Sequence, residues 1–396
     1  MYNNTNRSFS ERRGRMKIGV LKETSANESR VALVPAHIPA LLKRDFSVLV
    51  EKGAGYAAGY EDAEYLEKGA RLHSAKEILQ EADIVCVVRG AAARDDGEAL
   101  AASLSAKQIL IGMLEPYQPH QAFDELLKKK VTSFSLELIP RTTRAQSMDV
   151  LSSMANLAGY KSVLLAAETS PKMFPMMMTA AGTIPASKVF VLGVGVAGLQ
   201  AIATAKRLGA LVFAYDVRSE VKDQVLSLGA KFVEFDLESA SGEGGYAKQM
   251  DEAYYEKQRQ LMIETIKDMD VVITTANIPG KKAPILVTTA MIEAMAPGSV
   301  IIDLAAERGG NCEGTKPGET AVMNGVTIVG PLNIPSTLAF NASALYSKNM
   351  TTFIDNLLDK GSFELRRDDD IVAATMITEN GQITNERASQ WIGGSQ

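Results

Sequence analysis

The sequence is poor in the residues that build disulfide scaffolds, metal centres and histidine-based active sites. Its 396 residues include two cysteines and three histidines. Cys86 and Cys312 show no metal-binding spacing, so the sequence predicts a reducing compartment and no metal site. We expect His37 and His120 to precede helices and His73 to lie in a turn, which favours surface roles over acid–base catalysis for all three.

The sequence also lacks a dominant charge and a membrane-spanning segment. Its 42 basic and 47 acidic residues give a net charge of −5, and no basic cluster indicates nucleic-acid binding. The uncharged run 189–205 is at the short limit for a span and contains three glycines and Gln200, which argues against a direct membrane span. Residues 1–15 are polar and arginine-bearing and lack the apolar segment of a secretory signal. We expect them to be a disordered extension and Met16 to be the functional start.

What is present is a pattern of short apolar runs that alternate with helical stretches. With 46% hydrophobic and 22% charged residues, the chain is expected to form two globular domains. Helices are expected over 35–44, 60–69 and 75–82. Alternation at this spacing predicts a parallel sheet covered on both faces. The strands expected in this first domain are Lys17–Leu21, Ser47–Val50, Ile84–Val88, Ile109–Met113 and Val131–Leu136.

Two long helical patterns, 147–167 and 337–359, suggest that the chain passes twice between domains. The sequence therefore predicts an α/β fold of two doubly wound, Rossmann-like parallel-sheet domains, joined by long helices with a cleft between them. The first domain is expected over 16–150 plus 336–396 and the second over 151–335. In the second, strands are expected near Val189, Leu211, Phe232, Val271, Val300 and Thr327. The polar tail contains strand-like pieces at 371–377.

The second domain opens with a glycine-rich motif in a specific context. The apolar run Val189–Leu192 leads into Gly193-Val194-Gly195-Val196-Ala197-Gly198, and a helical pattern follows to Leu208. In a dinucleotide site the first glycine permits the tight turn, the second lets the pyrophosphate approach, and the third allows close packing of helix and strand. An ordinary glycine-rich α/β turn is the alternative, which the full pattern disfavours.

An acid follows at the expected distance. Asp216 ends the next apolar run, eighteen residues after Gly198. Its carboxylate is suited to accept hydrogen bonds from the adenosine ribose hydroxyls and to repel a 2′-phosphate, which favours NAD over NADP. Arg218, two residues further on, weakens that preference.

Two loops are candidates for the nicotinamide end of the site. The loop 140–149 follows the last strand of the first domain and places Arg141, Gln146 and Asp149 together, with Ser152 just after it. Asp149 and Ser152 could instead cap the helix that begins there, and for Asp149 alone capping is an equally good interpretation. The loop as a whole is better explained as a site, because ligands gather at the carboxyl ends of parallel strands. The segment 241–250 places glycines beside Tyr246, which suggests a mobile lid. A surface insertion is an equally good interpretation of that segment.

A different set, Arg30, Arg89, Glu115 and Glu307, also falls at expected strand ends or loops. An amino-acid or hydroxy-acid dehydrogenase needs a cation for the substrate carboxylate and a general acid or base, usually His or Lys. The set supplies cations, but no histidine is convincingly placed beside them.

From Met16 to about Leu358 the sequence resembles the soluble NAD(H)-binding component, or first domain, of proton-translocating nicotinamide nucleotide transhydrogenases. The motifs that carry the resemblance are RAQSMDVLSS at 144–153, FPMMMTAAGT at 174–183, GVGVAGLQAIATAKRLGA at 193–210 and GGYAK at 244–248. That family is related to alanine dehydrogenase, which shares the Lys-Glu-Thr and Arg-Val-Ala-Leu-Val-Pro pattern within 22–35. Arg89, Glu115 and Glu307 stand here where alanine dehydrogenases carry a lysine, a histidine and an aspartate.

The resemblance implies an enzyme that transfers hydride from NADH to NADP⁺ held by a partner component. It implies that Arg141, Gln146, Asp149, Ser152 and Tyr246 act at the nicotinamide end. Partners would be a second copy of the chain, an NADP(H)-binding component and a membrane component that moves protons, which places the chain on the cytoplasmic face of a bacterial plasma membrane. The implied cofactor-binding residues are Gly193, Gly195, Val196, Ala197, Gly198, Asp216, Val217, Arg218, Ala276 and Asn277.

Two other functions stay open at this point. The first is a free-standing NAD-dependent amino-acid dehydrogenase similar to alanine dehydrogenase. The second is a non-catalytic module that senses NAD and regulates a partner. Hydride transfer between nicotinamides makes or breaks no O–H or N–H bond at the reacting carbons, so the absence of a placed histidine favours transhydrogenation.

Overall fold

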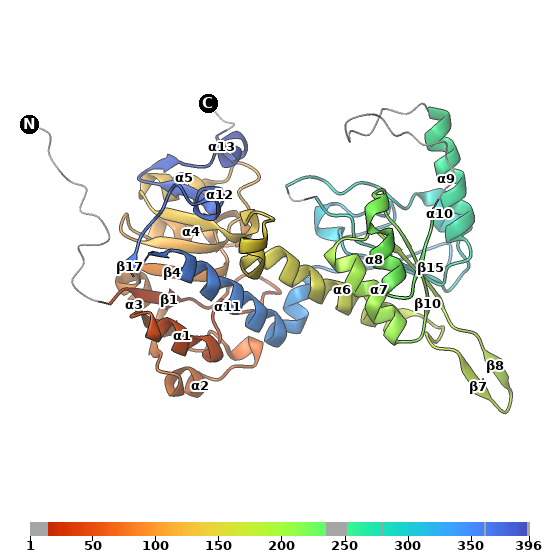
Figure 1. The fold of residues 1–396 in the computed structure, drawn as a ribbon, viewed down its shortest axis with the longest axis horizontal. Helices are drawn as coiled ribbons and strands as arrows, with labels where there is room; N and C mark the ends of the chain where they lie inside the picture. The colour runs from red at the N-terminus through yellow and green to blue at the C-terminus, as the bar shows by residue number, and fades with distance from the viewer. Residues whose placement is uncertain (1–14, 235–251, 279, 360–361, 394–396) are drawn as a thin grey trace, which may run out of the picture. The chain divides into compact units, whose positions relative to one another are not determined.

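The computed structural model describes residues 15–234, 252–278, 280–359 and 362–393. These residues form two compact units, which are described separately (Figure 1). Unit 1 comprises Met1–Met154 with Pro335–Gln396, and unit 2 comprises Ala155–Ile334. The division falls within helix α6, Val150–Thr169. The predicted boundaries lie at 150/151 and 335/336.

Unit 1 is built on an eight-stranded sheet with the order β19-β18-β6-β5-β4-β1-β2-β3. Strands β1 to β6 run parallel, and β18 and β19 add an antiparallel edge. The apolar and largely buried residues of β1, β2, β4 and β5 suit strands that are covered on both faces. The strands are Lys17–Val20, Ser47–Glu51, Arg71–His73, Ile84–Arg89, Ile109–Met113, Thr132–Ser135, Met376–Glu379 and Gln382–Ile383, for β1 to β6, β18 and β19 in turn.

Helices cover both faces of this sheet. On one face, α3, α4 and α5 pack with Val85, Val87 and Leu110 in a single buried cluster. On the other, Phe353 of α11 meets Phe134 of β6 edge to face, with ring centroids 5.4 Å apart. The helices are α1 Ile38–Lys43, α2 Asp62–Glu67, α3 Ala75–Glu81, α4 Gly97–Ser103, α5 Gln121–Lys128, α11 Ala339–Asn356, α12 Asp370–Thr375 and α13 Glu386–Ile392.

Unit 2 has a seven-stranded sheet with the order β11-β10-β9-β12-β13-β15-β14, parallel except for β14. The strand order reverses between β9 and β12, as it does in dinucleotide-binding folds. The strands are β9 Lys188–Leu192, β10 Leu211–Tyr215, β11 Lys231–Phe232, β12 Val271–Thr274, β13 Val300–Asp303, β14 Thr320–Met323 and β15 Val326–Val329.

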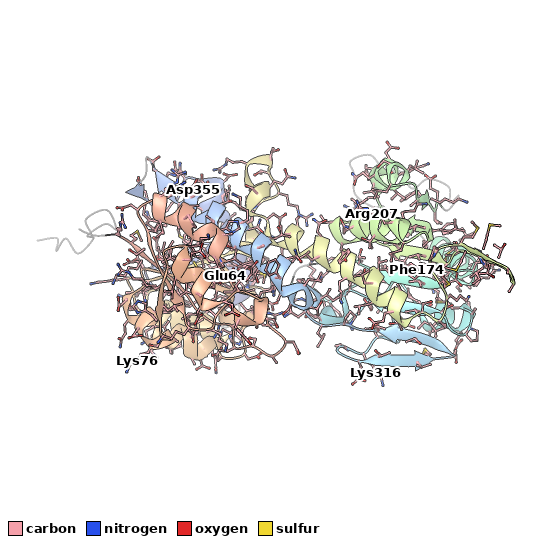
Figure 2. The ribbon with its side chains drawn as sticks, turned by 90° about the horizontal axis from the view of Figure 1, so that it is seen from below. Glu64, Lys76, Phe174, Arg207, Lys316 and Asp355 are labelled. Atoms are coloured by element: carbon pink, nitrogen blue, oxygen red, sulfur yellow. The ribbon has the colours of Figure 1, made fainter. Side chains whose placement is uncertain are left out.

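Alternate residues of these strands build two cores. Val189, Val191 and Ile273 face α6, α7 and α8, whereas Phe190 and Val272 face α9 and α10. Phe174 is buried, and charged side chains such as Lys316 are exposed (Figure 2). The helices are α7 Val196–Arg207, α8 Lys222–Ser227, α9 Glu252–Ile266 and α10 Thr289–Ala294; smaller antiparallel pairs are β7 Met177–Thr179 with β8 Gly182–Ile184, and β16 Leu358–Asp359 with β17 Ser362–Phe363.

The predicted fold class, two doubly wound α/β domains, is confirmed, and the cleft between them stays a prediction. Two local predictions are wrong. His73 ends β3 instead of lying in a turn. The segment 371–377 is mainly helix, because Asp369 caps α12 by accepting hydrogen bonds from the N–H groups of Ile371 and Val372. Among the described residues, no helix combines the length and apolar character that crossing a bilayer requires.

Candidate functional site

The glycine turn of unit 2 joins β9 to α7 at the point where the strand order reverses. Gly193 has φ +96°, which disfavours any residue with a side chain. A Cβ on Gly198 would lie 2.0 Å from the Gly193 carbonyl oxygen, so only glycine allows this approach of helix to strand. A Cβ on Gly195 would meet no atom within 4 Å. The three glycines therefore have different roles, and the space beside Gly195 is open.

Helix α7 begins beside that open space. Gly195 is its N-cap residue, and Val196 and Ala197 form its first turn. The first N–H groups of a helix have no partner within it and favour an anion. Gly159 of α6 packs against this turn, since a Cβ there would lie 2.1 Å from the Ala197 carbonyl oxygen. The turn is thus packed against α6 at Ala197 and has open space beside Gly195.

Asp216 follows β10 and contacts the glycine turn directly. Its Oδ2 accepts a hydrogen bond from the Val194 N–H at 2.7 Å. Arg218 donates to the same carboxylate through its backbone N–H and through Nε, both at 2.9 Å, and through a terminal guanidinium nitrogen at 3.0 Å. Burial by itself would raise the pKa of Asp216, but these hydrogen bonds lower it overall. The carboxylate is therefore ionised at neutral pH. Val217, between these two residues, is exposed.

The segment after β12 completes the turn. Thr275 donates its hydroxyl hydrogen to the Gly193 carbonyl oxygen at 2.8 Å. The side chain of Asn311 binds both polar groups of the Ala276 backbone, accepting from its N–H at 3.0 Å and donating to its carbonyl oxygen at 2.8 Å. Asn277, the next residue, is exposed. The predicted cofactor-binding residues of unit 2 thus converge on the carboxyl ends of β9, β10 and β12.

Sequence reasoning missed the residues that hold this segment. Asp303 at the end of β13 is fully buried, and its carboxylate accepts hydrogen bonds from the N–H groups of Asn311 and Cys312 and from the hydroxyls of Thr274 and Thr315. This network fixes Asn311, which fixes Ala276. One sequence signal could have indicated Asp303: it is an acid at the end of an apolar strand, and Gly309-Gly310 follow it. The resemblance to alanine dehydrogenases singles out Glu307 in this stretch instead.

The loop expected at the nicotinamide end lies in unit 1. It forms a 3₁₀ helix, η6, over Thr143–Met148, and α6 starts at Val150 rather than at 147. Asp149 accepts hydrogen bonds from the Ser152 N–H at 2.9 Å and from the Ser152 hydroxyl at 2.6 Å. Asp149 therefore caps the first turn of α6, as one of the two interpretations of this residue predicts. Arg141 and Gln146 are exposed.

Arg144 and Asn349 anchor this loop within unit 1. Arg144 forms an ion pair with Asp369 at 2.8 Å and another with Asp370. Asn349 of α11 donates to the Ser147 carbonyl oxygen at 2.8 Å. Tyr246 and the predicted lid 241–250 lie outside the described residues.

The second set of candidates, Arg30, Arg89, Glu115 and Glu307, forms contacts within the unit to which each residue belongs. The Glu28 carboxylate, fully buried, lies 2.6 Å from a guanidinium nitrogen of Arg30 and 2.9 Å from Nε of Arg89. Burial opposes ionisation of Glu28, yet the hydrogen bonds and charge of Arg30 lower its pKa to about 2. In unit 2, Glu307 accepts a hydrogen bond from the Asn333 N–H at 2.7 Å. Glu115 follows β5, and its N–H donates to Glu137 at 2.6 Å.

The histidines have local structural roles. His37 Nδ1 lies 2.7 Å from the Ser347 hydroxyl, and His120 accepts a hydrogen bond from the Ala122 N–H as the N-cap of α5. His73 Nδ1 is 3.9 Å from Glu77. None of these contacts involves a predicted site residue.

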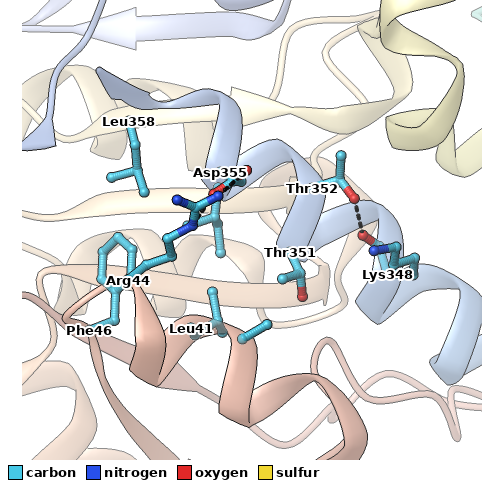
Figure 3. A pocket seen from close by; sticks show the side chains of 10 residues that line it. Leu41, Arg44, Phe46, Lys348, Thr351, Thr352, Asp355 and Leu358 are labelled. Atoms are coloured by element: carbon cyan, nitrogen blue, oxygen red, sulfur yellow. Dashed lines mark hydrogen bonds and ion pairs between the residues drawn. The ribbon is translucent and has the colours of Figure 1, made fainter. Parts of the chain in front are cut away.

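A cavity of about 210 Å³ lies between α1 and α11 of unit 1 (Figure 3). Arg44 and Asp355 form an ion pair at its wall, 2.8 Å apart. Of the predicted site residues that the structure describes, none lines this cavity, so it is separate from the site described above.

Comparison with known proteins adds an independent finding. Residues 19–158 match the alanine dehydrogenase/PNT N-terminal domain, and residues 162–386 match the alanine dehydrogenase/PNT C-terminal domain. The chain is 48% identical to the first part of NAD(P) transhydrogenase subunit alpha of Rickettsia prowazekii, over 93% of the chain and 96% of that protein. The crystal structure of transhydrogenase from Sinorhizobium meliloti superposes with a TM-score of 0.83 at 44% identity, covering 93% of this chain and 99% of that one. Alanine dehydrogenase of Methanococcus maripaludis is 28% identical, over 95% of the chain and 96% of that protein.

Proposed function

The chain belongs to the alanine dehydrogenase/PNT family, and from this premise we propose that it is the NAD(H)-binding component of a proton-translocating transhydrogenase. In this function it holds NADH while a partner component holds NADP⁺, and hydride passes directly between them. Relatives named as the first part of transhydrogenase subunit alpha support this choice over the more distant alanine dehydrogenases.

The observation that carries the proposal is the open space in front of Gly195. A dinucleotide needs a place where its pyrophosphate approaches the backbone at a helix N-terminus. A Cβ at Gly195 would project into that space and touch nothing, while Gly193 and Gly198 have no such freedom. The residues therefore fit NAD(H), with Val196 and Ala197 at the pyrophosphate and Asp216 at the adenosine ribose.

Bound NADH supplies a hydride from its nicotinamide ring. The chain's own residues have to bind and orient that ring, because no proton has to be delivered to the reacting carbons. We assign this task to Arg141, Gln146 and Asp149, with Ser152 fixing the orientation of the Asp149 carboxylate through its two hydrogen bonds. Tyr246 is proposed to close over the ring, and Ala276 and Asn277 to contact the nicotinamide side of the cofactor.

A second copy of the chain belongs to this proposal. Every residue of β7 and β8 is exposed, and Met176 and Met178 are 59% and 77% exposed. The whole stretch from Met173 to Ser187 contains no charge. An exposed, uncharged, methionine-rich hairpin favours contact with protein, and we assign it to the homodimer. The dimer would act on the cytoplasmic face of a bacterial plasma membrane, through a membrane-spanning component that moves protons.

The alanine dehydrogenase alternative is less favoured by the geometry. Such an enzyme needs cations for the substrate carboxylate and an acid or base near neutral pKa. Arg30 and Arg89 already share the buried carboxylate of Glu28, and the three histidines have the contacts described above.

The test is reconstitution with the NADP(H)-binding component and an NADP analogue whose reduction is followed by absorbance. We expect NADH-dependent reduction in the mixture and little turnover by the chain alone. No reduction in the mixture, or NADH oxidation by the chain alone with pyruvate and ammonia, would contradict the proposal. The Gln146→Asn variant tests the role of the loop: it should slow hydride transfer far more than it weakens NADH binding, and equal losses would mean that Gln146 only supports binding.

A further inference from the structure

The carboxylate of Asp216 has its acceptor positions filled by neighbouring donors. An ionised carboxylate offers about four lone-pair sites for hydrogen bonds. Asp216 accepts from the Val194 N–H, the Arg218 N–H, Arg218 Nε and a terminal nitrogen of Arg218. Two of these donors are backbone groups and two belong to the guanidinium.

The backbone donors and the guanidinium donors differ in how easily they can move away from the Asp216 carboxylate. The Val194 N–H belongs to the glycine turn, and the Arg218 N–H lies only two residues from Asp216, so both are fixed by the backbone. The guanidinium is at the end of a side chain that is 55% exposed, whereas the Asp216 side chain is only 7% exposed. Because the guanidinium is more than half exposed, water can replace the hydrogen bonds that it loses when it leaves the carboxylate.

An adenosine ribose presents two neighbouring hydroxyl groups, and the Arg218 side chain vacates two acceptor positions when it leaves. Two hydrogen bonds from the ribose hydroxyls can therefore replace the two hydrogen bonds from the guanidinium to Asp216. The Arg218 terminal nitrogen also lies 3.4 Å from the Val194 carbonyl oxygen, so the guanidinium contacts the backbone of the glycine turn as well as Asp216. A 2′-phosphate on that ribose would meet the guanidinium and the carboxylate together.

We infer that Arg218 is a specificity-determining residue whose affinity for a 2′-phosphate is masked by its ion pair with Asp216. The inference rests on the proposed binding of NAD(H) at this turn. Asp216 then selects NADH in two ways: it repels the phosphate of NADPH, and it holds the neighbouring guanidinium that would bind that phosphate. Arginine and phosphate form strong bidentate pairs when the arginine is free. Glu220, the other acid that acts on Arg218, adds a smaller attraction to the guanidinium.

The experiment measures dissociation constants for NADH and NADPH with the full chain and three variants: Asp216→Asn, Arg218→Gln, and both together. Asparagine can still accept from the Val194 N–H but carries no charge to hold the guanidinium. We expect Asp216→Asn to tighten NADPH binding by about tenfold or more and to weaken NADH binding. Adding Arg218→Gln should abolish most of the gain for NADPH. Arg218→Gln alone should leave NADPH binding weak and should tighten NADH binding, because the ribose no longer has to displace a guanidinium from Asp216.

Each outcome decides between explanations. If the double variant keeps the NADPH gain, simple loss of repulsion accounts for it and the inference is wrong. If Arg218→Gln alone weakens NADH binding several-fold, Arg218 contacts NADH directly and the inference is wrong. This single variant still tests the inference if Asp216→Asn does not fold. Failure of the unaltered chain to bind NADH would overturn the proposed function and the inference with it. Asp355→Asn, which breaks an exposed arginine–aspartate pair in unit 1 away from the proposed site, should change neither constant.

Discussion

The two sheets share a strand order but use the point of reversal differently. In unit 1 the order runs β3-β2-β1-β4-β5-β6, and in unit 2 it runs β11-β10-β9-β12-β13-β15. In both, the first strand lies beside the fourth, where open α/β sheets bind ligands. Unit 2 has a glycine turn there, with open space in front of Gly195.

Unit 1 fills the equivalent place with its own side chains. Glu23 follows β1 and accepts hydrogen bonds from the N–H groups of Val88 and Arg89 in β4, at 2.6 and 3.3 Å. Glu28 follows and binds Arg30 and Arg89. At this point unit 1 therefore has buried internal carboxylates, whereas unit 2 has open space in front of Gly195. Under the proposed function, the same topology gives a unit that binds the cofactor and a unit whose equivalent position is occupied by its own side chains.

The largest expected effect comes from breaking the internal ion pairs of unit 1. Glu28→Gln leaves Arg30 buried without its carboxylate partner, which should lower the free energy of unfolding by about 3–5 kcal/mol. Urea denaturation followed by circular dichroism measures this. Glu81→Gln removes an exposed partner of Lys17 in the same unit and should have little effect. Equal destabilisation by both variants would contradict a special role for the buried pair.

Gly198→Ala should produce the next largest loss, in unit 2. A Cβ 2.0 Å from the Gly193 carbonyl oxygen forces α7 away from β9, at a cost of about 3 kcal/mol. Thermal denaturation should show a clear drop in Tm, accompanied by loss of NADH binding. An unchanged Tm would mean that the helix is not held against the turn as described.

Glu23 should give unit 1 a pH-dependent stability. Burial raises the pKa of Glu23 to about 7, against the opposing charge of Arg94. A carboxyl whose folded-state pKa is raised contributes stability at low pH and loses it as the pH rises toward that value. The stability of the unaltered chain, relative to Glu23→Gln, should therefore fall by about 1–3 kcal/mol between pH 5 and pH 8. A difference that stays constant across that range would show that Glu23 does not titrate there.

Gly195→Ala should have the smallest effect on stability and a clear effect on binding. A Cβ at this position touches no protein atom, so Tm should match that of the unaltered chain. NADH binding should weaken by about tenfold or more, because the methyl group occupies the space assigned to the pyrophosphate. Titration of NADH fluorescence gives the dissociation constant. Unchanged affinity would place the pyrophosphate elsewhere.

Local patterns predict most of the fold. Apolar runs mark the main parallel strands of both sheets, and the glycine spacing marks the turn between β9 and α7. The segment 371–377 shows where such patterns fail. A short apolar run fits either a strand or a buried helix, and the capping bonds of Asp369 decide in favour of a helix.

The site is predictable only where its signals are local in sequence. The Asp303 network links residues that the chain brings together from different strand ends, and Asn311 holds Ala276 across 35 residues. Glu28 meets Arg89 across 61 residues. No spacing rule in one sequence predicts such partners. The proposed exchange of Arg218 for ribose hydroxyls likewise rests on the four hydrogen bonds around Asp216, which only the structure shows.

The most direct test of the contrast between the two sheets is a crystal structure of the chain with NADH. We expect one dinucleotide per chain, with its pyrophosphate at Gly195 and the Arg218 guanidinium displaced from Asp216. The carboxylates of Glu23 and Glu28 should keep their contacts at the strand ends of unit 1. A pyrophosphate bound at the β1 and β4 ends, with the glycine turn of unit 2 empty, would contradict the assignment of binding to unit 2.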